Sequence, residues 1–444
     1  MSSGYKNTWL WNLGFSAYWF ATSWKWFVVL LIVLPAQVKL VLTNQFIAAG
    51  NTAEAAARLA DGVKDARWGW VIGIGAVWAV FGPAIFGGLS DRIRTKWGHR
   101  QPFIAIGAAM TAVALITLGG AHAYWMLVAG YLFLQVSDDV GTGPYSAMVP
   151  EAVPEEHRGK ASSIMSMLQL LGQLGSGIVA IVLVRLNGLE AAISAIYLGV
   201  ASVNIACAIV TLITVRKVRA GEVHADSKEP FLKQWIRPFR SPDFVWVWVT
   251  RFINALGFYL VVEFLQYFIG GAYKQFVIFG FSLPGDTHAD QASTATLLLA
   301  LTLALTGAIG AGVASRFADR WGRKRLIYTS GVIVFCALVP FAFARDLTQA
   351  FYLAVVFGVG YGLYLSADWA LVSDVVPNKD AAGSDMGVWQ MSISSVQLVS
   401  GLAGWAIGSL NKSSPLLGYM SAIVFAGCLF LLSTVLVRQV KGSR

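Results

Sequence analysis

The feature that most limits the fold of this chain is a series of long apolar runs separated by short polar segments. Each run approaches or exceeds the roughly 20 residues that a helix needs to cross a bilayer. Because lipid offers no partners to backbone amides, a spanning run must pair them internally as a helix. The sequence therefore predicts an all-α membrane protein with twelve transmembrane helices. The runs lie at residues 14–42, 68–89, 102–121, 124–149, 161–184, 191–215, 243–269, 293–316, 326–344, 349–373, 384–410 and 416–437.

The distribution of charge predicts the orientation of these helices. Charged residues make up 13% of the chain, against roughly a quarter in soluble domains, so a net charge of +10 does not by itself indicate a nucleic-acid partner. With alternating spans, 23 Lys and Arg residues fall on one side of the bilayer and 7 on the other. Positive residues gather on the cytoplasmic side. We predict a multi-pass protein of the plasma or inner membrane with both termini cytoplasmic, surrounded by lipid and without a nucleic-acid partner.

Two sequence patterns occur twice at nearly the same separation. The basic loop 87–102 contains Asp91, and a shorter version places Asp319 228 residues later. An acid three residues before a proline occurs at Glu151 and again at Asp374, 223 residues later. These offsets predict an internal duplication. We expect two pseudo-symmetric six-helix bundles, at 1–215 and 243–444, joined by a polar cytoplasmic linker at 216–242.

Ionisable residues inside the predicted spans are few, and each costs at least about 2.5 to 3.5 kcal/mol to insert. They recur on every third helix, at equivalent places of the two repeats, so we expect them to line one central cavity and to contact substrate or proton. The alternative is that these residues form structural ion pairs or extend their side chains to the membrane interface. For Lys39 and Asp368, which lie toward helix ends, this structural explanation and a functional role are equally good. The candidates are Lys25, Asp138, Asp139, Arg251, Glu263 and Asp368.

Asp138 and Asp139 form an adjacent acid pair in the middle of the fourth predicted helix. Two carboxylates so close oppose each other's second charge, which favours proton uptake by one of them. Successive helical residues point about 100° apart, so one of the two faces the cavity squarely. We predict proton coupling through this pair, without a choice between its members.

Amide and tryptophan side chains accompany these charges. Gln169 and Gln173 share a helix face, and Gln390 lies beside Trp389. Amides both donate and accept hydrogen bonds, and flat aromatic faces beside them suit a sugar ring. Hydrogen bonding between helices is an equally good explanation of the amides. The further predicted substrate contacts of this kind are Trp24, Trp26, Asn254 and Gln266.

Motifs for catalysis are missing from the sequence. We find no phosphate-binding loop, no zinc-protease motif and no nucleophile with a base partner. The chain is therefore predicted not to be an enzyme and to need no cofactor or metal.

The basic loops carry a resemblance to a known family. The stretch from Asp319 to Arg325 resembles the loop between helices 8 and 9 of the major facilitator superfamily, and 87–102 resembles its partner between helices 2 and 3. Ser90-Asp91-Arg92 and residues 97–104 are similar to the sucrose transporter-like and glycoside-pentoside-hexuronide symporters. Gly143-Pro144, Pro154 and Arg158-Gly159 fit the same comparison, whereas His99, Gln101, Gln135 and Ser315 depart from it.

The resemblance implies a secondary transporter that alternates access to a central site. We expect symport of a sugar or glycoside with a proton, by a monomer; the alternative is a proton-coupled exporter of drug-like or other small organic molecules, and a sensor or scaffold without transport is a third possibility. The repeated loops are predicted to form a cytoplasmic gate, with Arg158 joining Arg92, Arg100 and Glu151. The predicted gate residues are Gly87, Asp91, Arg92, Arg100, Glu151, Arg158, Asp319, Arg320, Gly322, Arg323 and Asp374.

Overall fold

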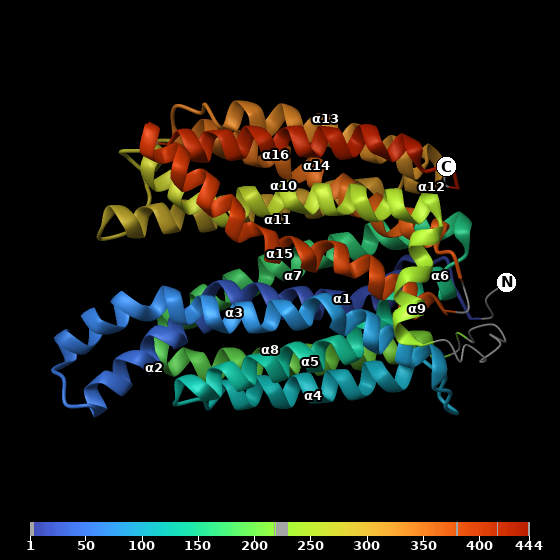
Figure 1. The fold of residues 1–444 in the computed structure, drawn as a ribbon, viewed down its shortest axis with the longest axis horizontal. Coiled ribbons are helices and arrows are strands. Elements are labelled where there is room, and N and C mark those ends of the chain that lie inside the picture. The colour runs from blue at the N-terminus through green and yellow to red at the C-terminus, as the bar shows by residue number, and fades with distance from the viewer. Residues whose placement is uncertain (1–3, 217, 219–229, 379–380, 415, 443–444) are drawn as a thin grey trace. The chain divides into compact units, whose positions relative to one another are not determined.

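The computed structural model describes residues 4–442 except 217, 219–229, 379–380 and 415, and long helices account for most of it (Figure 1). In the first part of the chain these are α1 (Trp9–Val28), continued through a π-helical turn (Val29–Val33) into α2 (Leu34–Ala48), then α3 (Ala53–Arg92), α4 (Gln101–Gly119), α5 (Tyr124–Ser146), α7 (Arg158–Asn187) and α8 (Leu189–Val215). The short α6 (Met148–Ala152) and a 3-10 turn (Glu155–His157) connect α5 to α7.

The second part begins with the short α9 (Phe231–Ile236) and a 3-10 turn (Arg237–Arg240). Its long helices are α10 (Pro242–Ala272), α11 (His288–Ala314), α13 (Arg323–Phe341), α14 (Leu347–Val375), α15 (Ala382–Ser413) and α16 (Leu417–Leu436), with the short α12 (Ala318–Trp321) between α11 and α13 and a final 3-10 turn (Val437–Gln439). Within the described ranges, ten helices are long and apolar enough to cross a membrane; α5 and α15 are the two remaining long ones. The predicted all-α membrane fold is confirmed.

Two segments between the predicted spans are partly regular. Most of residues 43–67 is helical, because α2 runs on to Ala48 and α3 already begins at Ala53. The Ala-rich sequence simply extends the spanning helices, because helix propensity needs no apolar face to propagate from an existing helix. In the loop 270–292, β1 (Val277–Ile278) and β2 (Phe281–Ser282) form a two-stranded antiparallel hairpin.

The chain forms two compact units, which we describe separately. The first unit comprises Met1–Ala152, Leu171–Trp235 and Lys379–Val388, and the second comprises Val153–Leu170, Ile236–Asn378 and Trp389–Arg444. The start of α7 thus belongs to the second unit, and the start of α15 to the first. The division into repeats around 216–242 stays a prediction; residues 217 and 219–229 of that linker lie outside the described ranges.

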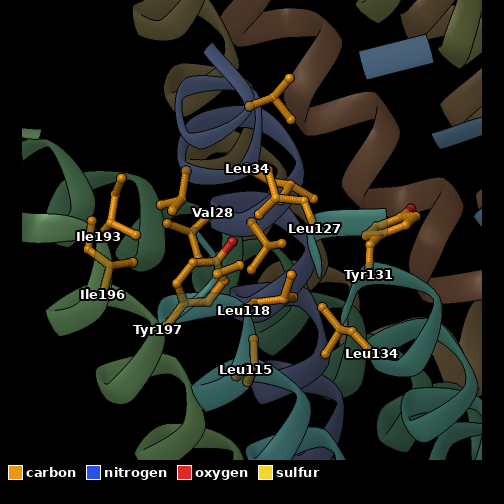
Figure 2. Packing of buried hydrophobic residues seen from close by; sticks show 14 of the residues in the cluster. Val28, Leu34, Leu115, Leu118, Leu127, Tyr131, Leu134, Ile193, Ile196 and Tyr197 are labelled. Atoms are coloured by element: carbon orange, nitrogen blue, oxygen red, sulfur yellow. The ribbon is translucent and has the colours of Figure 1, made fainter. Parts of the chain in front are cut away.

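The core of the first unit lies where α1 and α2 meet α4, α5 and α8 (Figure 2). Leu118, Leu127 and Tyr197 are almost wholly buried there. Between helices in lipid, close packing and hydrogen bonds replace the hydrophobic drive of water. The Gln37 side chain supplies both, because its Nε2 donates to Leu118 O at 2.8 Å and its Oε1 accepts from Tyr197 at 3.0 Å.

The second unit has an aromatic core. Phe268, Phe341, Phe357 and Phe430 pack together from α10, α13, α14 and α16. Edge contacts such as that of Phe357 with Phe430, with ring centroids 6.0 Å apart, suit the quadrupoles of the rings. This core holds α10 and α14, which carry Arg251 and Asp368, in fixed positions.

Candidate transport and gating sites

A buried ion pair joins α1 to α5 in the first unit. The Lys25 ammonium contacts Oδ1 of Asp138, and Trp26 Nε1 donates to Oδ2 at 2.6 Å. Lys25 is fully buried and Asp138 is 3% exposed. Removal of one member of such a pair leaves an uncompensated charge, which is strongly unfavourable. Asp138 is thus the counter-ion of Lys25.

Asp139 lies in a different environment from its neighbour, although it is equally buried. Among the residues that the structure describes, it makes no ion pair, and Gln135 Nε2 lies 3.5 Å from its Oδ2. Trp78 Nε1 on α3 also faces this carboxyl. The environments of the two acids that were predicted as one proton-coupling pair therefore differ. Asp138 pairs with a cation, whereas the hydrogen-bond donor of Asp139 is the neutral Gln135.

A second cluster joins α10, α14 and α15 in the second unit. Arg251 Nε lies 3.4 Å from Asp368 Oδ2, and Arg251 Nη2 donates to Gln390 Oε1 at 2.9 Å. The Arg251 guanidinium stacks on Trp389, with Cζ 3.1 Å from the ring centroid. Tyr364 donates to Asp368 at 3.2 Å. Arg251 Nη1 and Trp389 Nε1 are buried and have no hydrogen-bond acceptor among the described residues, so both are free to donate to a ligand oxygen.

The other predicted substrate contacts are distributed elsewhere. Asn254 donates to Ser433 on α16 at 3.3 Å, and Gln266 donates to Ser293 on α11 at 2.7 Å, as expected for hydrogen bonds between helices. Glu263 is exposed. Trp24 packs on Phe20, with centroids 5.6 Å apart, and Gln169 and Gln173 are half-buried on α7. The structure thus gathers Lys25, Trp26, Asp138 and Asp139 in one cluster, and Arg251, Asp368, Trp389 and Gln390 in the other.

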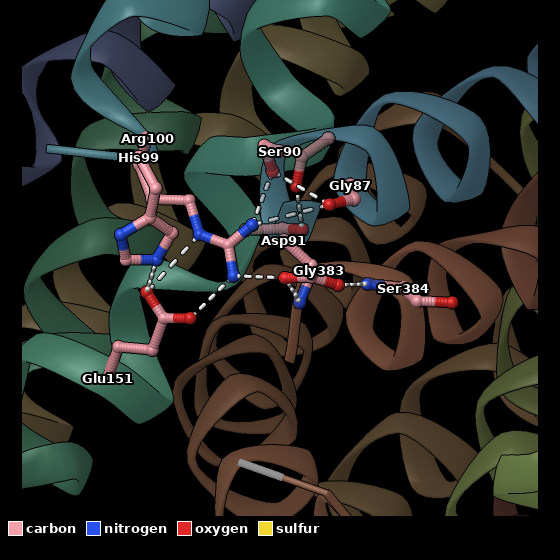
Figure 3. A network of polar contacts seen from close by, with 10 residues as sticks. Gly87, Ser90, Asp91, His99, Arg100, Glu151, Gly383 and Ser384 are labelled. Atoms are coloured by element: carbon pink, nitrogen blue, oxygen red, sulfur yellow. Dashed lines mark hydrogen bonds and ion pairs between the residues drawn. The ribbon is translucent and has the colours of Figure 1, made fainter. Parts of the chain in front are cut away.

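The basic loop that follows α3 forms a buried charge network in the first unit (Figure 3). Arg100 Nη2 lies 2.6 Å from Asp91 Oδ1 and also contacts Glu151, which pairs with His99 at 3.2 Å. Gly98 has φ of 109°, which turns the chain so that His99 and Arg100 both point at Glu151. Burial opposes the charge of Glu151, but the Arg100 guanidinium and hydrogen bonds from His99 and Arg100 outweigh it and lower the pKa of this carboxyl to about 2.

Asp91 in addition caps the start of α15. Its carboxylate accepts from the backbone amides of Gly383 at 3.1 Å and Ser384 at 2.9 Å, the second and third residues of that helix. A helix N-terminus presents unpaired amides and a partial positive charge, so an acid there is stabilising. Gly87 has no side chain that would meet the Gly383 backbone, which lets α3 approach α15 closely.

The second unit contains the equivalent cap. Asp319, on α12, accepts from the Lys160 amide at 3.2 Å and also from Gly159, the third and second residues of α7. Burial raises the pKa of the Asp319 carboxyl, although these amides and the charge of Arg323 act in the other direction. Gly322, with φ of 85°, allows the turn between α12 and α13. The two repeated loops therefore perform the same task on two different helices.

Asp374 completes this second network. It pairs with Arg323 at 3.0 Å and with Arg158 at 3.1 Å, and Arg158 also donates to Ser373 O at 2.8 Å. Arg158 was predicted to join Arg92, Arg100 and Glu151; its contacts described in the second unit are with Ser373 and Asp374 of α14 and with the carbonyl of Val153. Its position at the first residue of α7, which packs in that unit, explains the difference. Arg320 is exposed and Arg92 half-buried.

Sequence reasoning missed the helix starts that receive the two acids. A sequence signal for a close approach at these helix starts was present, because both helices have a glycine at their second position. These glycines are Gly159 in α7 and Gly383 in α15. Trp78 and Gly82 beside Asp139 were also missed, since neither residue type on an apolar helix indicates a site.

A sequence model described as "Major Facilitator Superfamily" matches residues 42–401, most of the chain. The chain belongs to the major facilitator superfamily. It is accordingly a multi-pass membrane transporter and not an enzyme, and members of the superfamily bind small-molecule substrates and typically use ions.

Among superfamily relatives, the chain is 23% identical over 328 residues to the multi-drug resistance efflux pump PmrA of Streptococcus pneumoniae. This match covers 70% of this chain and 71% of PmrA. The fold is similar to that of the proton:xylose symporter XylE (TM-score 0.70, 13% identity, 98% of this chain and 97% of that one). It is also similar to the E. coli fucose:proton symporter FucP (TM-score 0.66, 14% identity, 97% and 98%) and to the human organic anion transporter MFSD10 (TM-score 0.60, 14% identity, 96% and 98%). At these identities the structural likeness shows the fold alone.

Proposed function

We propose that this transporter carries a sugar or glycoside together with a proton, and that Asp139 binds the proton. The observation that carries the proposal is the unequal environment of the acid pair. Lys25 and Trp26 occupy both oxygens of Asp138, so each of its acceptor oxygens already has a donor. Asp139, buried and without a cation partner among the described residues, gains most from a proton, because a buried unpaired charge is costly.

The cluster around Arg251 supports a hydroxyl-rich substrate. It offers the free donors Arg251 Nη1 and Trp389 Nε1, the amide of Gln390 and the indole of Trp389. A pyranose presents oxygens at its rim and C–H groups on its faces, which suit donors and an aromatic surface respectively. XylE and FucP are by name proton symporters of sugars, which agrees with this choice.

The two capped helix starts are proposed to be the cytoplasmic gate. Both caps consist of charge-assisted hydrogen bonds to backbone amides, which form and break without rearrangement of the helices themselves. Release of α15 from Asp91 and of α7 from Asp319 would accompany the change between states of an alternating-access cycle. The protein works as a monomer in this proposal, with its termini and gate in the cytoplasm of a cell whose plasma or inner membrane it crosses.

The second candidate is a proton-coupled exporter of drug-like molecules. The same observation favours it, since a buried carboxyl without a counter-ion accepts an organic cation as well as a proton, and PmrA is by name an efflux pump. The two candidate functions differ in their substrate: a symporter carries a sugar together with the proton, whereas an exporter exchanges a drug-like molecule for it.

Uptake by purified protein in proteoliposomes separates them. We expect saturable counterflow of members of a neutral sugar and glycoside panel, and their accumulation when an inward proton gradient is imposed. Asp139→Asn should abolish accumulation while sparing counterflow. Full accumulation by Asp139→Asn would remove this residue from the mechanism. Counterflow of lipophilic cations without any sugar would establish the exporter.

A further inference from the structure

We propose that Gly82 and Trp78 of α3 position the Asp139 carboxyl and set the pH range over which it takes up and releases its proton. This inference rests on the proposed role of Asp139. Both are positioning residues, since each acts through that carboxyl.

The packing of α3 against α5 leaves room for the carboxyl only because residue 82 is a glycine. A Cβ atom built at Gly82 would collide with Oδ2 of Asp139 and would lie 2.8 Å from Cγ of Asp139 and 2.8 Å from Trp78 Nε1. Real Cβ atoms do not approach other atoms so closely, so the Asp139 side chain would have to move. The absence of a side chain at Gly82 thus leaves the space that the Asp139 carboxyl occupies.

Trp78 lies one turn before Gly82, on the same face of α3. Its Nε1 is buried, lies with the Asp139 carboxyl against the Gly82 position, and has no other acceptor near it among the hydrogen bonds of the described residues, so the carboxylate is the group that it faces. Gln135 supplies a second N–H at 3.5 Å. Neutral donors of this kind stabilise the charged carboxylate and weaken its hold on a proton.

The charged and titratable groups around Asp139 lie on α1 and on α5 itself. Lys25 and Tyr18 face it from α1, and Asp138 precedes it on α5. Trp78 is the contribution of α3, and it is neutral. A change at Gly82 therefore moves the carboxyl relative to its donors without altering any charge, which separates positioning from simple electrostatics.

The test compares two alanine substitutions on one helix. Gly82→Ala displaces the carboxyl from the Trp78 indole, so the charged form loses a donor and the proton is held more tightly. We expect the pH of half-maximal proton-driven uptake to rise by about one unit, with counterflow retained. Gly73→Ala is the control, because a Cβ at Gly73 meets nothing within 4 Å. Trp78→Phe keeps the ring but removes the N–H, and should shift the profile in the same direction.

Infrared titration of the protonated carboxyl band provides a readout that does not depend on transport. The band should titrate at higher pH in Gly82→Ala and Trp78→Phe than in the unaltered protein and in Gly73→Ala, and it should disappear in Asp139→Asn. An unchanged titration of the carboxyl band in Trp78→Phe and Gly82→Ala would overturn the inference. If Gly82→Ala does not fold, the titration of Trp78→Phe by itself tests the inference. If the band shifts but Asp139→Asn still accumulates sugar, positioning stands and the proposed coupling fails.

Discussion

The Asp91 carboxylate accepts a hydrogen bond from the backbone amide of Ser384 at 2.9 Å, across 293 residues of sequence. Asp319 makes the equivalent bond to Lys160 at 3.2 Å, across 159 residues. In both cases an acid of a repeated loop holds the third residue of a long helix. This shared geometry gives the two sequence patterns one physical purpose.

Loss of the charge at either cap should weaken the hold on the capped helix. Asp91→Asn keeps an oxygen acceptor but removes the interaction with the helix dipole and with Arg100, together worth about 1 to 2 kcal/mol. We expect Ser384→Cys, in a background without Cys207, Cys336 and Cys428, to react with an impermeant maleimide at least about 5-fold faster when Asp91→Asn is added. Lys96→Gln, at an exposed residue of the same loop, should leave the rate unchanged. Equal rates in all variants would show that the cap does not restrain α15.

Glu151 should contribute to stability in a pH-dependent way. Its folded pKa of about 2 is below the ordinary 4.5, so its contribution is complete above pH 4.5 and is lost as pH falls from 4.5 toward 2. Glu151→Gln should lower the free energy of unfolding by about 3 kcal/mol at pH 7, and the difference should narrow below pH 4.5. Thermal unfolding in detergent measures this. Glu156→Gln, an exposed neighbour, should have little effect, and a pH-independent difference would contradict the role of the charge.

Lys25 should matter through Asp138. Lys25→Met leaves Asp138 buried without its counter-ion, and should destabilise the protein by about 3 to 5 kcal/mol and stop transport. Asp138→Asn in the same protein should restore much of the stability, because no charge then remains unpaired. Lys39→Met breaks the exposed pair with Asp61, 2.8 Å long, and should cost less than about 1 kcal/mol. Additive effects of Lys25→Met and Asp138→Asn in a double-mutant cycle would exclude the pairing.

The free donors beside Arg251 should contribute to substrate affinity. Trp389→Phe removes Nε1 but keeps an aromatic face for Arg251, and should raise the half-saturating sugar concentration in counterflow by about 10-fold. Arg251→Lys, which loses both the stacking and the fork of donors, should be more severe. Trp405→Phe, at an exposed residue of α15, is the matched control. An unchanged half-saturating concentration in Trp389→Phe would place the sugar elsewhere.

Much of the architecture was predictable from the sequence because apolar length alone specifies a spanning helix. The acid pair was also visible, since Asp138 and Asp139 interrupt an otherwise apolar run. The difference between the environments of the two acids could not be predicted. It depends on Lys25, 113 residues from Asp138, and on the side of α5 that each carboxyl faces. The true start of α3 was missed for another reason: its first turns lie in a polar segment, where the limits of an apolar run give no information.

The predicted gate residues show the same limit of sequence-based prediction. Asp91, Arg100 and Glu151 were grouped correctly because their loops repeat, but the donors that Asp91 meets are backbone amides, which every residue except proline possesses. No pattern of side chains in the sequence predicts which backbone amide an acid will contact. The contacts of Arg158 with Ser373 and Asp374 were not predicted, because a helix that begins in one compact unit and continues in the other cannot be recognised from spacing.

Because the amides of α7 and α15 are main-chain groups, the two caps place few demands on the sequences that they hold. Mutational drift in those first turns leaves the donors in place, and only the bulk at Gly159 and Gly383 is constrained by the surrounding atoms. The first turns of α7 and α15 can therefore vary at their other positions while both caps persist.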